Sequence, residues 1–330
     1  MITRRGLIAS TAAIAATPLV ACDPAPQSST TTAAASATPA PSSAAAAGSA
    51  ADVPAQAGAG EAAAAVRAPV LPPSDWTLDK FHAAMAASGR PTRLSEAQFQ
   101  AIQARKPVAI QRIRSYLTQR LGSADPAVIA AFEAVPREYY HYLYSERRSQ
   151  ATSAYEESPK PWPLGFGSVL SDYLGQAYMT QVAKPKPGDV TLEIGTGSGF
   201  QSSLLSRIAK QSYTIEIIEP IGRAVDKIFK PLGYDNIEGR VGDGYFGWPE
   251  VTDGFDIIIV TCVAQYAPPE LFKQLKPGGR LLIPIGQPFK RGQVLYVYTK
   301  DANGKVHSRR DVGVYFIPMT GQMQATPAPT

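Results

Sequence analysis

The sequence predicts an α/β fold in which a doubly wound, mostly parallel sheet with antiparallel edge strands is preceded by an α-helical N-terminal region. Three observations predict it. After Gly188, short runs rich in β-branched residues alternate with helical segments, as in a parallel sheet with crossover helices. Residues 257–260 (Ile-Ile-Ile-Val) are apolar at every position, which suits a strand buried on both faces. Before Gly188, apolar residues instead recur at helical spacing.

The helical N-terminal region is expected to cover residues 71–150 and contains two helix-start patterns. Ser95 with Gln98 three residues later is typical of a capping box, and apolar residues follow at helical spacing. Asp125 and Pro126 combine an N-cap residue with proline at the first helical position, which predicts a helix running through Phe132. Most of residues 75–143 are therefore expected to be helical.

Residues 151–330 are expected to form the sheet domain. The predicted strands are 190–194, 213–218, 237–241, 255–261, 280–285 and 293–299. The predicted crossover helices lie near 201–210, 221–232 and 269–275. Residues 293–318 lack a helical pattern and end in the apolar run 314–317, so antiparallel strands are expected to close this edge of the sheet.

The first 22 residues resemble an export signal. Arg4 and Arg5 precede a weakly apolar stretch, as in signals of the pathway that exports folded proteins. The stretch ends in small residues before Cys22, which resembles a bacterial lipobox whose cysteine is lipidated. The alternative is cleavage elsewhere, with Cys22 incidental. We expect a periplasmic or outer-surface lipoprotein of a bacterium, and a cytoplasmic protein if the signal is misassigned.

The composition sets expectations for contacts with membrane, nucleic acid and metal ions. Residues 23–70 are almost entirely Ala, Pro, Ser, Thr and Gly, so they are expected to form a disordered tether. No later apolar stretch reaches 18 residues, so membrane contact is expected only through the N-terminal anchor. The net charge of +5 comes without basic runs, so nucleic acid is not an expected partner. Cysteine and histidine occur nowhere at ligand spacing, and no metal is expected.

A glycine-rich loop comes after the predicted strand 190–194. Gly195, Thr196, Gly197, Ser198 and Gly199 form a G-x-G-x-G turn between a strand and a helix. Such a turn lets a ligand approach the backbone and places its polar part near helix N–H groups. Simple turn glycines are the alternative explanation. The pattern gains specificity from the residues at the ends of the next two strands.

Two more strand ends complete a pattern that indicates a nucleoside site. Glu216 lies 21 residues after Gly195, where its carboxylate can accept hydrogen bonds from both ribose hydroxyls. Asp243 and Gly244 come after the next strand, where a carboxylate can accept from an adenine amino group and glycine leaves room for the ring. A solvated carboxylate and a plain turn are the alternatives. The three elements in this order predict a site at the carboxyl edge of the sheet.

These motifs resemble the protein-L-isoaspartate O-methyltransferase family. The matching segments are 192–201 (LEIGTGSGFQ), 213–216 (YTIE), 242–244 (GDG) and 275–280 (LKPGGR), with flanks at 134–137 (AVPR) and 316–320 (FIPMT). The resemblance covers about residues 126–321. It implies a class I, Rossmann-like methyltransferase fold, S-adenosyl-L-methionine as donor, and methyl esterification of L-isoaspartyl α-carboxylates in damaged proteins. A protein or peptide bearing isoaspartate is then the expected partner, and the chain is expected to be a monomer.

The resemblance also assigns roles to individual residues. It places the glycine loop against the methionine part of the donor, Glu216 on the ribose, and Asp243 with Gly244 beside the adenine. The full set of cofactor-binding residues that it implies is Leu170, Gly195, Thr196, Gly197, Gly199, Glu216, Asp243, Gly244 and Thr320.

The family's second signature is a loop resembling G-x-G-Q-T-I-S-x-P, which here is residues 165–173 (GFGSVLSDY). Ser171 matches the residue that serves the family as its active-site serine, which implies a catalytic role for it. The loop departs from the pattern at Ser168, Val169 and Tyr173. These departures bear on the acceptor that the enzyme methylates.

Methyl transfer from a sulfonium to a carboxylate needs no strong base, because a carboxyl group that titrates near 4 is already ionised at neutral pH. Ser171 is expected to donate a hydrogen bond that orients the carboxylate. No nucleophile-elbow pattern is present, and nothing marks a base beside Ser171 among His82, His141 and His307.

These observations leave three hypotheses. The first is a cell-envelope repair methyltransferase for isoaspartyl sites. The second is a methyltransferase of the same fold with another carboxylate or peptide acceptor, which the altered loop around Ser171 suggests. The third is a non-catalytic envelope lipoprotein that kept the fold, since S-adenosylmethionine is made in the cytosol and an exported enzyme has no obvious supply of it.

Overall fold

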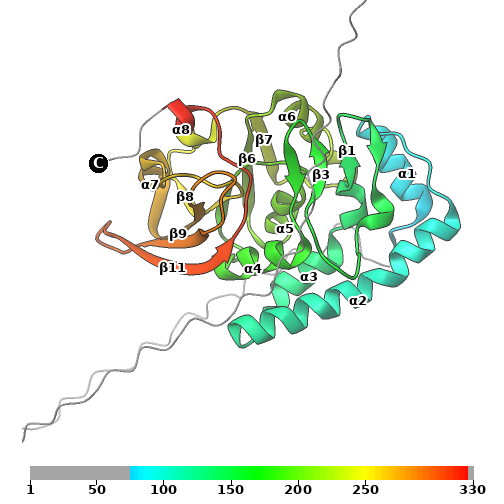
Figure 1. Ribbon diagram of the computed structural model, residues 1–330, viewed down its shortest axis with the longest axis horizontal. Coiled ribbons are helices and arrows are strands. Elements are labelled where there is room, and N and C mark those ends of the chain that lie inside the picture. Colours follow the sequence, from blue (N-terminus) through cyan, green and yellow to red (C-terminus); the bar gives the residue numbers. More distant parts are fainter. Residues whose placement is uncertain (1–74, 326–330) are drawn as a thin grey trace, which may run out of the picture. The chain divides into compact units, whose positions relative to one another are not determined.

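The computed structural model describes residues 75–325. The predicted signal, Cys22 and the predicted tether lie outside the described residues, as do 71–74 and 326–330. The centre of the described chain is a seven-stranded sheet in the order β11-β10-β9-β8-β5-β6-β7 (Figure 1). The predicted α/β fold class is confirmed.

The sheet is parallel over five strands and antiparallel at one edge. Its strands are β5 (Val190–Ile194), β6 (Gln211–Glu216), β7 (Ile237–Val241), β8 (Phe255–Val260), β9 (Leu275–Ile285), β10 (Gln293–Lys300) and β11 (Val306–Val314). Strands β7, β6, β5, β8 and β9 pair in parallel, whereas β10 pairs antiparallel with both β9 and β11. The chain builds outward from β5 to β7 and then restarts on the other side of β5 with β8. Ligands of doubly wound sheets bind at such a switch point.

The central strand β8 shows why these residues form a doubly covered sheet. Ile257 and Ile259 pack with residues of α4 (Tyr173–Ala183) and α5 (Phe200–Ile208). Their neighbours Ile258 and Val260 instead pack on the opposite face with Leu271 of α7 (Pro269–Gln274). Successive side chains of a strand point to opposite faces, so an unbroken apolar run is what two covered faces require.

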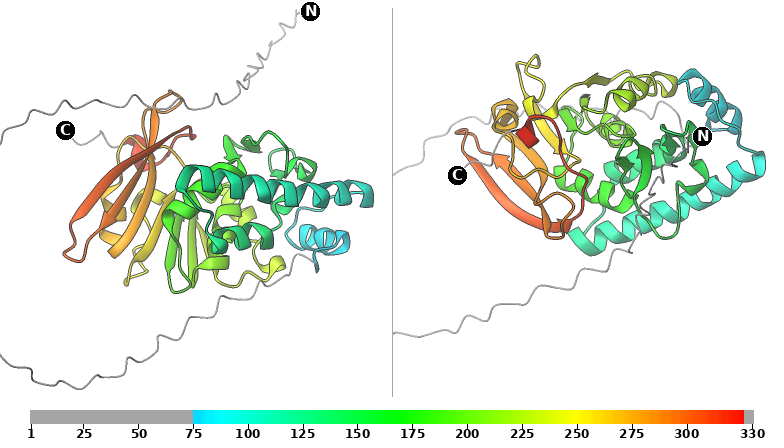
Figure 2. Two further views of the ribbon diagram at one scale, coloured as in Figure 1. Left: turned by 90° about the horizontal axis from the view of Figure 1, so that it is seen from below. Right: turned by 45° about the horizontal axis from the view of Figure 1, so that its top comes forward.

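The region before the sheet is helical as far as Ala134, whereas the end of the stretch 75–143, which was also expected to be helical, forms a 3₁₀ helix and a short strand. It contains α1 (Leu78–Ala87), α2 (Glu96–Leu121) and α3 (Pro126–Ala134). Ser95 and Gln98 form the expected capping box, and the Asp125 side chain caps α3. Figure 2 shows the long α2, which contacts α3 and α4. No helix within residues 75–325 is both long and apolar enough to cross a membrane.

One hydrophobic core joins this region to the sheet domain. Ile113 and Leu117 of α2, Phe132 of α3, and Phe200 and Leu204 of α5 belong to the same buried cluster. The residues on both sides of the predicted boundary at 150 therefore pack together.

Short elements connect α3 to α4. They are η2 (Arg137–Tyr140), the pair β1 (Tyr142–Leu143) and β2 (Arg148–Ser149), η3 (Ala151–Ser153), and the hairpin of β3 (Trp162–Gly165) with β4 (Ser168–Leu170). The hairpin carries most of the loop whose sequence resembles the family's second signature.

Several predicted bounds differ by a few residues, and the largest shift is that of the strand predicted over 280–285, which begins at Leu275. Two further predictions differ in the kind of element. The helix predicted over 221–232 is divided into α6 (Glu219–Val225) and η4 (Lys230–Leu232). Pro231 has no N–H to bond to the Lys227 carbonyl, so a regular helix cannot run from α6 into η4.

The apolar run 314–317 was also expected to belong to a strand at the edge of the sheet, but β11 stops at Val314. The Gln293 side chain accepts from the Phe316 N–H at 2.6 Å and donates to the Phe316 carbonyl at 3.1 Å. The backbone of Val263 then bonds to Ile317 and Met319, and the chain reaches α8 (Gln322–Ala325). Residues 315–322 therefore cross the carboxyl edge of the sheet, because their backbone groups find partners there.

Candidate active site

The glycine loop between β5 and α5 is built from left-handed turns. Gly195, Gly197 and Gly199 have φ values of 96°, 51° and 82°. A Cβ on Gly195 would lie 2.6 Å from Thr261 Oγ1, and one on Gly199 would lie 2.9 Å from Ile228 Cδ1. Side chains are therefore excluded from this loop both by conformation and by space.

The Glu216 carboxylate ties the glycine loop to the end of β6. Its Oε2 accepts from the Gly197 N–H at 2.8 Å, and its Oε1 accepts from the Ile218 N–H at 2.9 Å. The side chain is buried, and within residues 75–325 no Lys or Arg pairs with it. Burial raises its pKa. Each carboxylate oxygen retains a lone pair that can accept from a ligand hydroxyl.

Asp243 and Gly244 join the end of β7 to the C-terminal segment. Asp243 Oδ1 accepts from the Tyr245 N–H at 2.9 Å, and Oδ2 accepts from the Gln322 N–H at 2.7 Å. Gly244 begins η5 (Gly244–Phe246) and approaches β5 so closely that a Cβ would lie 2.2 Å from Ile194 Cγ2. Thr320 lies in the segment that Asp243 holds. The structure thus brings the predicted residues at 195–199, 216, 243–244 and 320 to one edge of the sheet.

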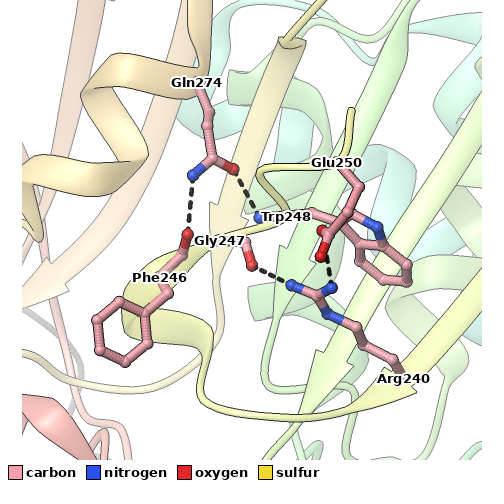
Figure 3. A network of polar contacts seen from close by, with 6 residues as sticks. All are labelled: Arg240, Phe246, Gly247, Trp248, Glu250 and Gln274. Carbon is pink, nitrogen blue, oxygen red and sulfur yellow. Dashed lines mark hydrogen bonds and ion pairs between the residues drawn. The ribbon is translucent and has the colours of Figure 1, made fainter. Parts of the chain in front are cut away.

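A polar network fixes the far end of the loop that carries Asp243 (Figure 3). Gln274 donates to the Phe246 carbonyl at 2.8 Å and accepts from the Trp248 N–H at 2.6 Å. Arg240 donates to the Gly247 carbonyl at 2.6 Å and pairs with Glu250 at 2.9 Å. The loop after β7 is therefore held at both ends.

The β3–β4 hairpin lies over the glycine loop. A Cβ built on Gly197 would lie 3.5 Å from Leu164 Cδ1 and 3.8 Å from Ser168 Oγ. Leu170 is buried in the cluster that contains Phe200. The hairpin leads directly into Ser171, so this serine comes after a segment that contacts the glycine loop.

Ser171 is held through its backbone and not through its hydroxyl. Arg137 Nη2 donates to the Ser171 carbonyl at 2.7 Å, while Nη1 donates to Gln176 at 2.6 Å. The next residue, Asp172, caps α4 by accepting from the N–H groups of Leu174 and Gly175. The Ser171 hydroxyl makes no hydrogen bond with any residue of the described chain. It remains able to donate to an acceptor group.

Arg137 is fully buried, and burial lowers its pKa to about 10, so it stays cationic at neutral pH. Its guanidinium lies 4.9 Å from the centre of the Phe200 ring, in the first turn of α5. One buried cation therefore connects η2, the Ser171 loop, α4 and the helix after the glycine loop.

The Thr196 side chain anchors the glycine loop to the strand beneath it. Its hydroxyl lies 2.7 Å from Thr214 Oγ1, which in turn donates to Glu193 at 3.1 Å. On the neighbouring strand, the Thr261 hydroxyl lies 2.7 Å from the Gly195 carbonyl. These buried threonines hold the underside of the loop. Among the described residues, no three His, Cys, Asp or Glu side chains are grouped to hold a metal ion.

The sequence model of the family "Protein-L-isoaspartate(D-aspartate) O-methyltransferase (PCMT)" matches residues 111–324. The chain belongs to this family. A protein named protein-L-isoaspartate O-methyltransferase 1 from Nitrosospira multiformis is 39% identical over 249 residues, which are 75% of this chain and 99% of that protein. One of the same name from Cupriavidus necator is 43% identical over 198 residues, 60% of this chain and 73% of that protein.

Solved structures of the same family share the fold. One structure of a protein-L-isoaspartate O-methyltransferase superposes with a TM-score of 0.57 at 24% identity, covering 66% of this chain and 67% of that chain. The Plasmodium falciparum structure, in complex with S-adenosyl-L-homocysteine, superposes with a TM-score of 0.52 at 21% identity, covering 63% and 97%. The predicted class I methyltransferase fold and the resemblance to this family are confirmed.

Several residues that shape the site were not singled out from the sequence. Arg137 was noted only as part of a flanking motif, and Thr261 only as the end of a strand. Gly321 has a φ of 74°, and a Cβ there would lie 2.3 Å from Asp243 Oδ2. Contacts between residues so distant in the chain leave no local pattern in the sequence.

Glu193 provides a test of the buried layer beneath the glycine loop. It accepts from the hydroxyls of Ser202 and Thr214, and burial raises its pKa from 4.5 to about 8. The folded protein therefore binds a proton that the unfolded chain releases between about pH 4.5 and 8. The free energy of unfolding attributable to Glu193 should fall as pH rises through that window.

We expect Glu193→Gln to remove this dependence, because an amide does not titrate. Urea unfolding at several pH values should show the difference between wild type and variant changing by an amount on the order of a few kcal/mol between pH 5 and 8. Glu216 and His141, whose pKa values are also shifted by burial, are present in both proteins and cancel in this difference. A constant difference across the window would contradict the protonated state of Glu193.

Proposed function

We propose that this chain transfers the methyl group of S-adenosyl-L-methionine to the α-carboxylate of L-isoaspartyl residues in damaged proteins. The observation that carries the proposal is the convergence of the glycine loop, Glu216 and the Asp243–Gly244 turn at one edge of the sheet. When bound, the donor supplies an electrophilic methyl group on a positively charged sulfonium. Membership of the family supports both the donor and the acceptor.

The residues present fit this donor. Gly195, Gly197 and Gly199 leave a bare backbone for its methionine part, with Thr196 anchored beneath the loop and Leu170 on the hairpin that lies over it. Glu216 is a buried carboxylate without a cationic partner in the described chain, which suits ribose hydroxyls as donors. Asp243 can accept from an adenine amino group beside Gly244, and Thr320 borders the same space.

Ser171 is the proposed catalytic residue for the acceptor. Its hydroxyl is free of partners in residues 75–325, and its carbonyl is held by Arg137. A hydrogen bond from the hydroxyl would hold the acceptor carboxylate in line with the methyl group. Positioning of this kind can supply about 7–11 kcal/mol of the barrier, so no base is needed.

The altered loop before Ser171 is compatible with the isoaspartyl acceptor that membership of the family supports. Tyr173, which departs from the family pattern, donates to the Glu156 carbonyl at 2.9 Å and accepts from Arg112 at 3.0 Å. Ser168 is buried against the glycine loop. Two of the three departures are therefore accommodated by contacts within the fold, and Ser171 keeps its place in the sequence of the loop.

We further propose that the protein works as a monomer in the cell envelope, attached through a lipid on Cys22. The support is the sequence of the first 22 residues, with Arg4 and Arg5 before a weakly apolar stretch and small residues before the cysteine. Export of an already folded chain would allow the donor to travel in its site.

The anchor is tested in the full chain by metabolic labelling with a radioactive fatty acid. We expect the label in wild type and in a Cys262→Ser variant, and its loss in Cys22→Ser, with release of that variant from the membrane fraction. Label in Cys22→Ser, or none in wild type, would refute the lipid anchor.

Gly244→Ala tests the proposed adenine side of the donor site. The new Cβ would overlap Ile194 Cγ2, and the shifts of side chains and backbone that such overpacking forces cost about 1–3 kcal/mol of stability. We expect the dissociation constant of S-adenosyl-L-homocysteine, measured by calorimetry, to rise about tenfold. Gly188→Ala is the matched control, because a Cβ there meets nothing within 4 Å. If both variants bound S-adenosyl-L-homocysteine with equal affinity, the donor would not bind beside Gly244.

Ser171→Ala tests the acceptor side. Wild type should transfer labelled methyl to an isoaspartyl peptide and not to the same peptide with normal aspartate. The variant should lose about 10²-fold in kcat while it binds S-adenosyl-L-homocysteine normally, since loss of positioning acts on the reaction and not on the donor. Ser168→Ala serves as the control on the same loop.

These measurements also separate the three hypotheses. Transfer by wild type to a different carboxylate alone would support the second, and donor binding without any transfer would support the third. Full activity of Ser171→Ala would remove Ser171 from the reaction.

A further inference from the structure

Two exposed phenylalanines have backbone conformations that bulky residues rarely adopt. Phe166 at the tip of the β3–β4 hairpin is 50% exposed with a φ of 53°, and Phe289 between β9 and β10 is 71% exposed with a φ of 58°. The left-handed region is unfavourable for such side chains, and strain of this kind gathers at functional sites. Large exposed apolar side chains in turn mark interaction surfaces.

Both phenylalanines lie at the carboxyl edge of the sheet. The Phe166 hairpin covers the glycine loop after β5. Strand β9 runs parallel to β8, so the loop 286–292 leaves the same edge, and the Gly286 N–H donates to the Ala264 carbonyl in the loop after β8. Strands β5, β8 and β9 are neighbours, and their three ends span only about 10 Å at the usual strand spacing.

A third exposed aromatic residue belongs to the same region. Tyr315 is 55% exposed at the start of the segment that crosses the edge. Gln293 connects that segment to the Phe289 loop, since its side chain bonds to the Phe316 backbone and lies 3.5 Å from the Gln287 carbonyl. Tyr315 and Phe289 therefore stand on two loops that one side chain joins.

The loop that carries Phe289 is cationic. The segments 165–171, 261–268, 286–292 and 315–322 contain no acidic residue. Their charged side chains are Lys290 and Arg291, both exposed and next to Phe289. Aromatic residues with arginine are the combination that dominates protein-binding surfaces, and cations favour partners that carry carboxylates.

The donor leaves this half of the edge open. Its proposed contacts, Glu216 and Asp243, lie at the ends of β6 and β7, on the other side of β5. A large acceptor must therefore approach over β8, β9 and β10.

We propose that Phe166, Phe289, Lys290, Arg291 and Tyr315, which we call the aromatic rim, form the docking surface for the polypeptide that carries the acceptor residue. The inference rests on the proposed function and specifies its substrate as an unfolded segment with acidic residues beside the isoaspartate. The aromatic rings cover apolar parts of that segment, while Lys290 and Arg291 face its carboxylates.

The test compares a long and a short acceptor in the full chain. The long one is an unstructured isoaspartyl peptide of twelve residues with flanking Glu residues, and the short one is a blocked isoaspartyl tripeptide. Phe166→Gly and Phe289→Gly remove the ring but keep the left-handed backbone, which glycine adopts freely. Phe289→Trp retains an aromatic ring, and Val108→Gly removes a side chain that is 55% exposed on α2.

We expect each glycine variant of the rim to raise KM for the long peptide about tenfold, equivalent to about 1.4 kcal/mol. The value of kcat, the affinity for S-adenosyl-L-homocysteine and KM for the tripeptide should not change. Val108→Gly should behave as wild type, and Phe289→Trp should raise KM for the long peptide less than Phe289→Gly does. Replacing Lys290 and Arg291 with Gln should weaken the dependence of KM on salt.

Unchanged KM for the long peptide in both glycine variants would overturn the proposal, as would an equal rise for both peptides. If wild type methylates neither peptide, the proposed function fails. Fluorescence anisotropy of the labelled long peptide then tests, without any methyl transfer, whether the aromatic rim binds the peptide. Weaker binding in Phe289→Gly supports the docking surface, and unchanged binding overturns it. Loss of binding to phosphatidylserine vesicles with peptide binding intact would make the rim a membrane surface and overturn the proposal too.

Discussion

The site depends on one buried carboxylate. Glu216 ends β6 and accepts from the N–H of Gly197 in one loop and of Ile218 in the next. Two chain segments that are separated by a helix and a strand are thereby fixed to the same carboxylate, one at each oxygen atom. Burial of an ion is unfavourable, and its raised pKa reflects this, yet the two N–H groups keep it satisfied. The conformation of the glycine loop and its distance from β6 result from these bonds.

The remaining parts of the site are placed by reference to that loop. Thr261 contacts the carbonyl of Gly195 from β8, Gly244 packs on Ile194 from the end of β7, and the hairpin approaches Gly197 from above. Each contact uses a glycine or a hydroxyl where a larger side chain would collide. The edge of the sheet is therefore assembled from close backbone approaches, which is why so many of its residues are small.

Sequence analysis predicted what is periodic and local. The strands 190–194 and 237–241 were predicted with the observed bounds, and the capping box at Ser95 was recognised. The strand β11 was not assigned residue by residue, because an exposed edge strand such as Val306–Val314 has no apolar alternation. The division of α6 from η4 was missed because apolar spacing outweighed Pro231 in the prediction.

The site was predictable to the same extent and for the same reason. Glycines and carboxylates at successive strand ends obey a spacing, so their meeting at one edge of the sheet could be predicted from the chain. The hydrogen bond from Arg137 to the Ser171 carbonyl joins positions 34 residues apart, and the bond from the Gln322 N–H to Asp243 joins positions 79 residues apart. Only folding brings those partners together, and neither pair has a sequence pattern of its own.

The strand order explains how one edge can serve two molecules of very different size. Because the chain restarts at β8 on the far side of β5, the loops after β5, β6 and β7 surround one half of the edge, and the loops after β8 and β9 surround the other. In the first half, Asp243 contacts the C-terminal segment. The second half is bordered by exposed aromatic residues and two cations. Ser171 directly follows the hairpin that contacts Gly197, so the residue proposed to orient the carboxylate comes from a segment beside the loop proposed to bind the donor.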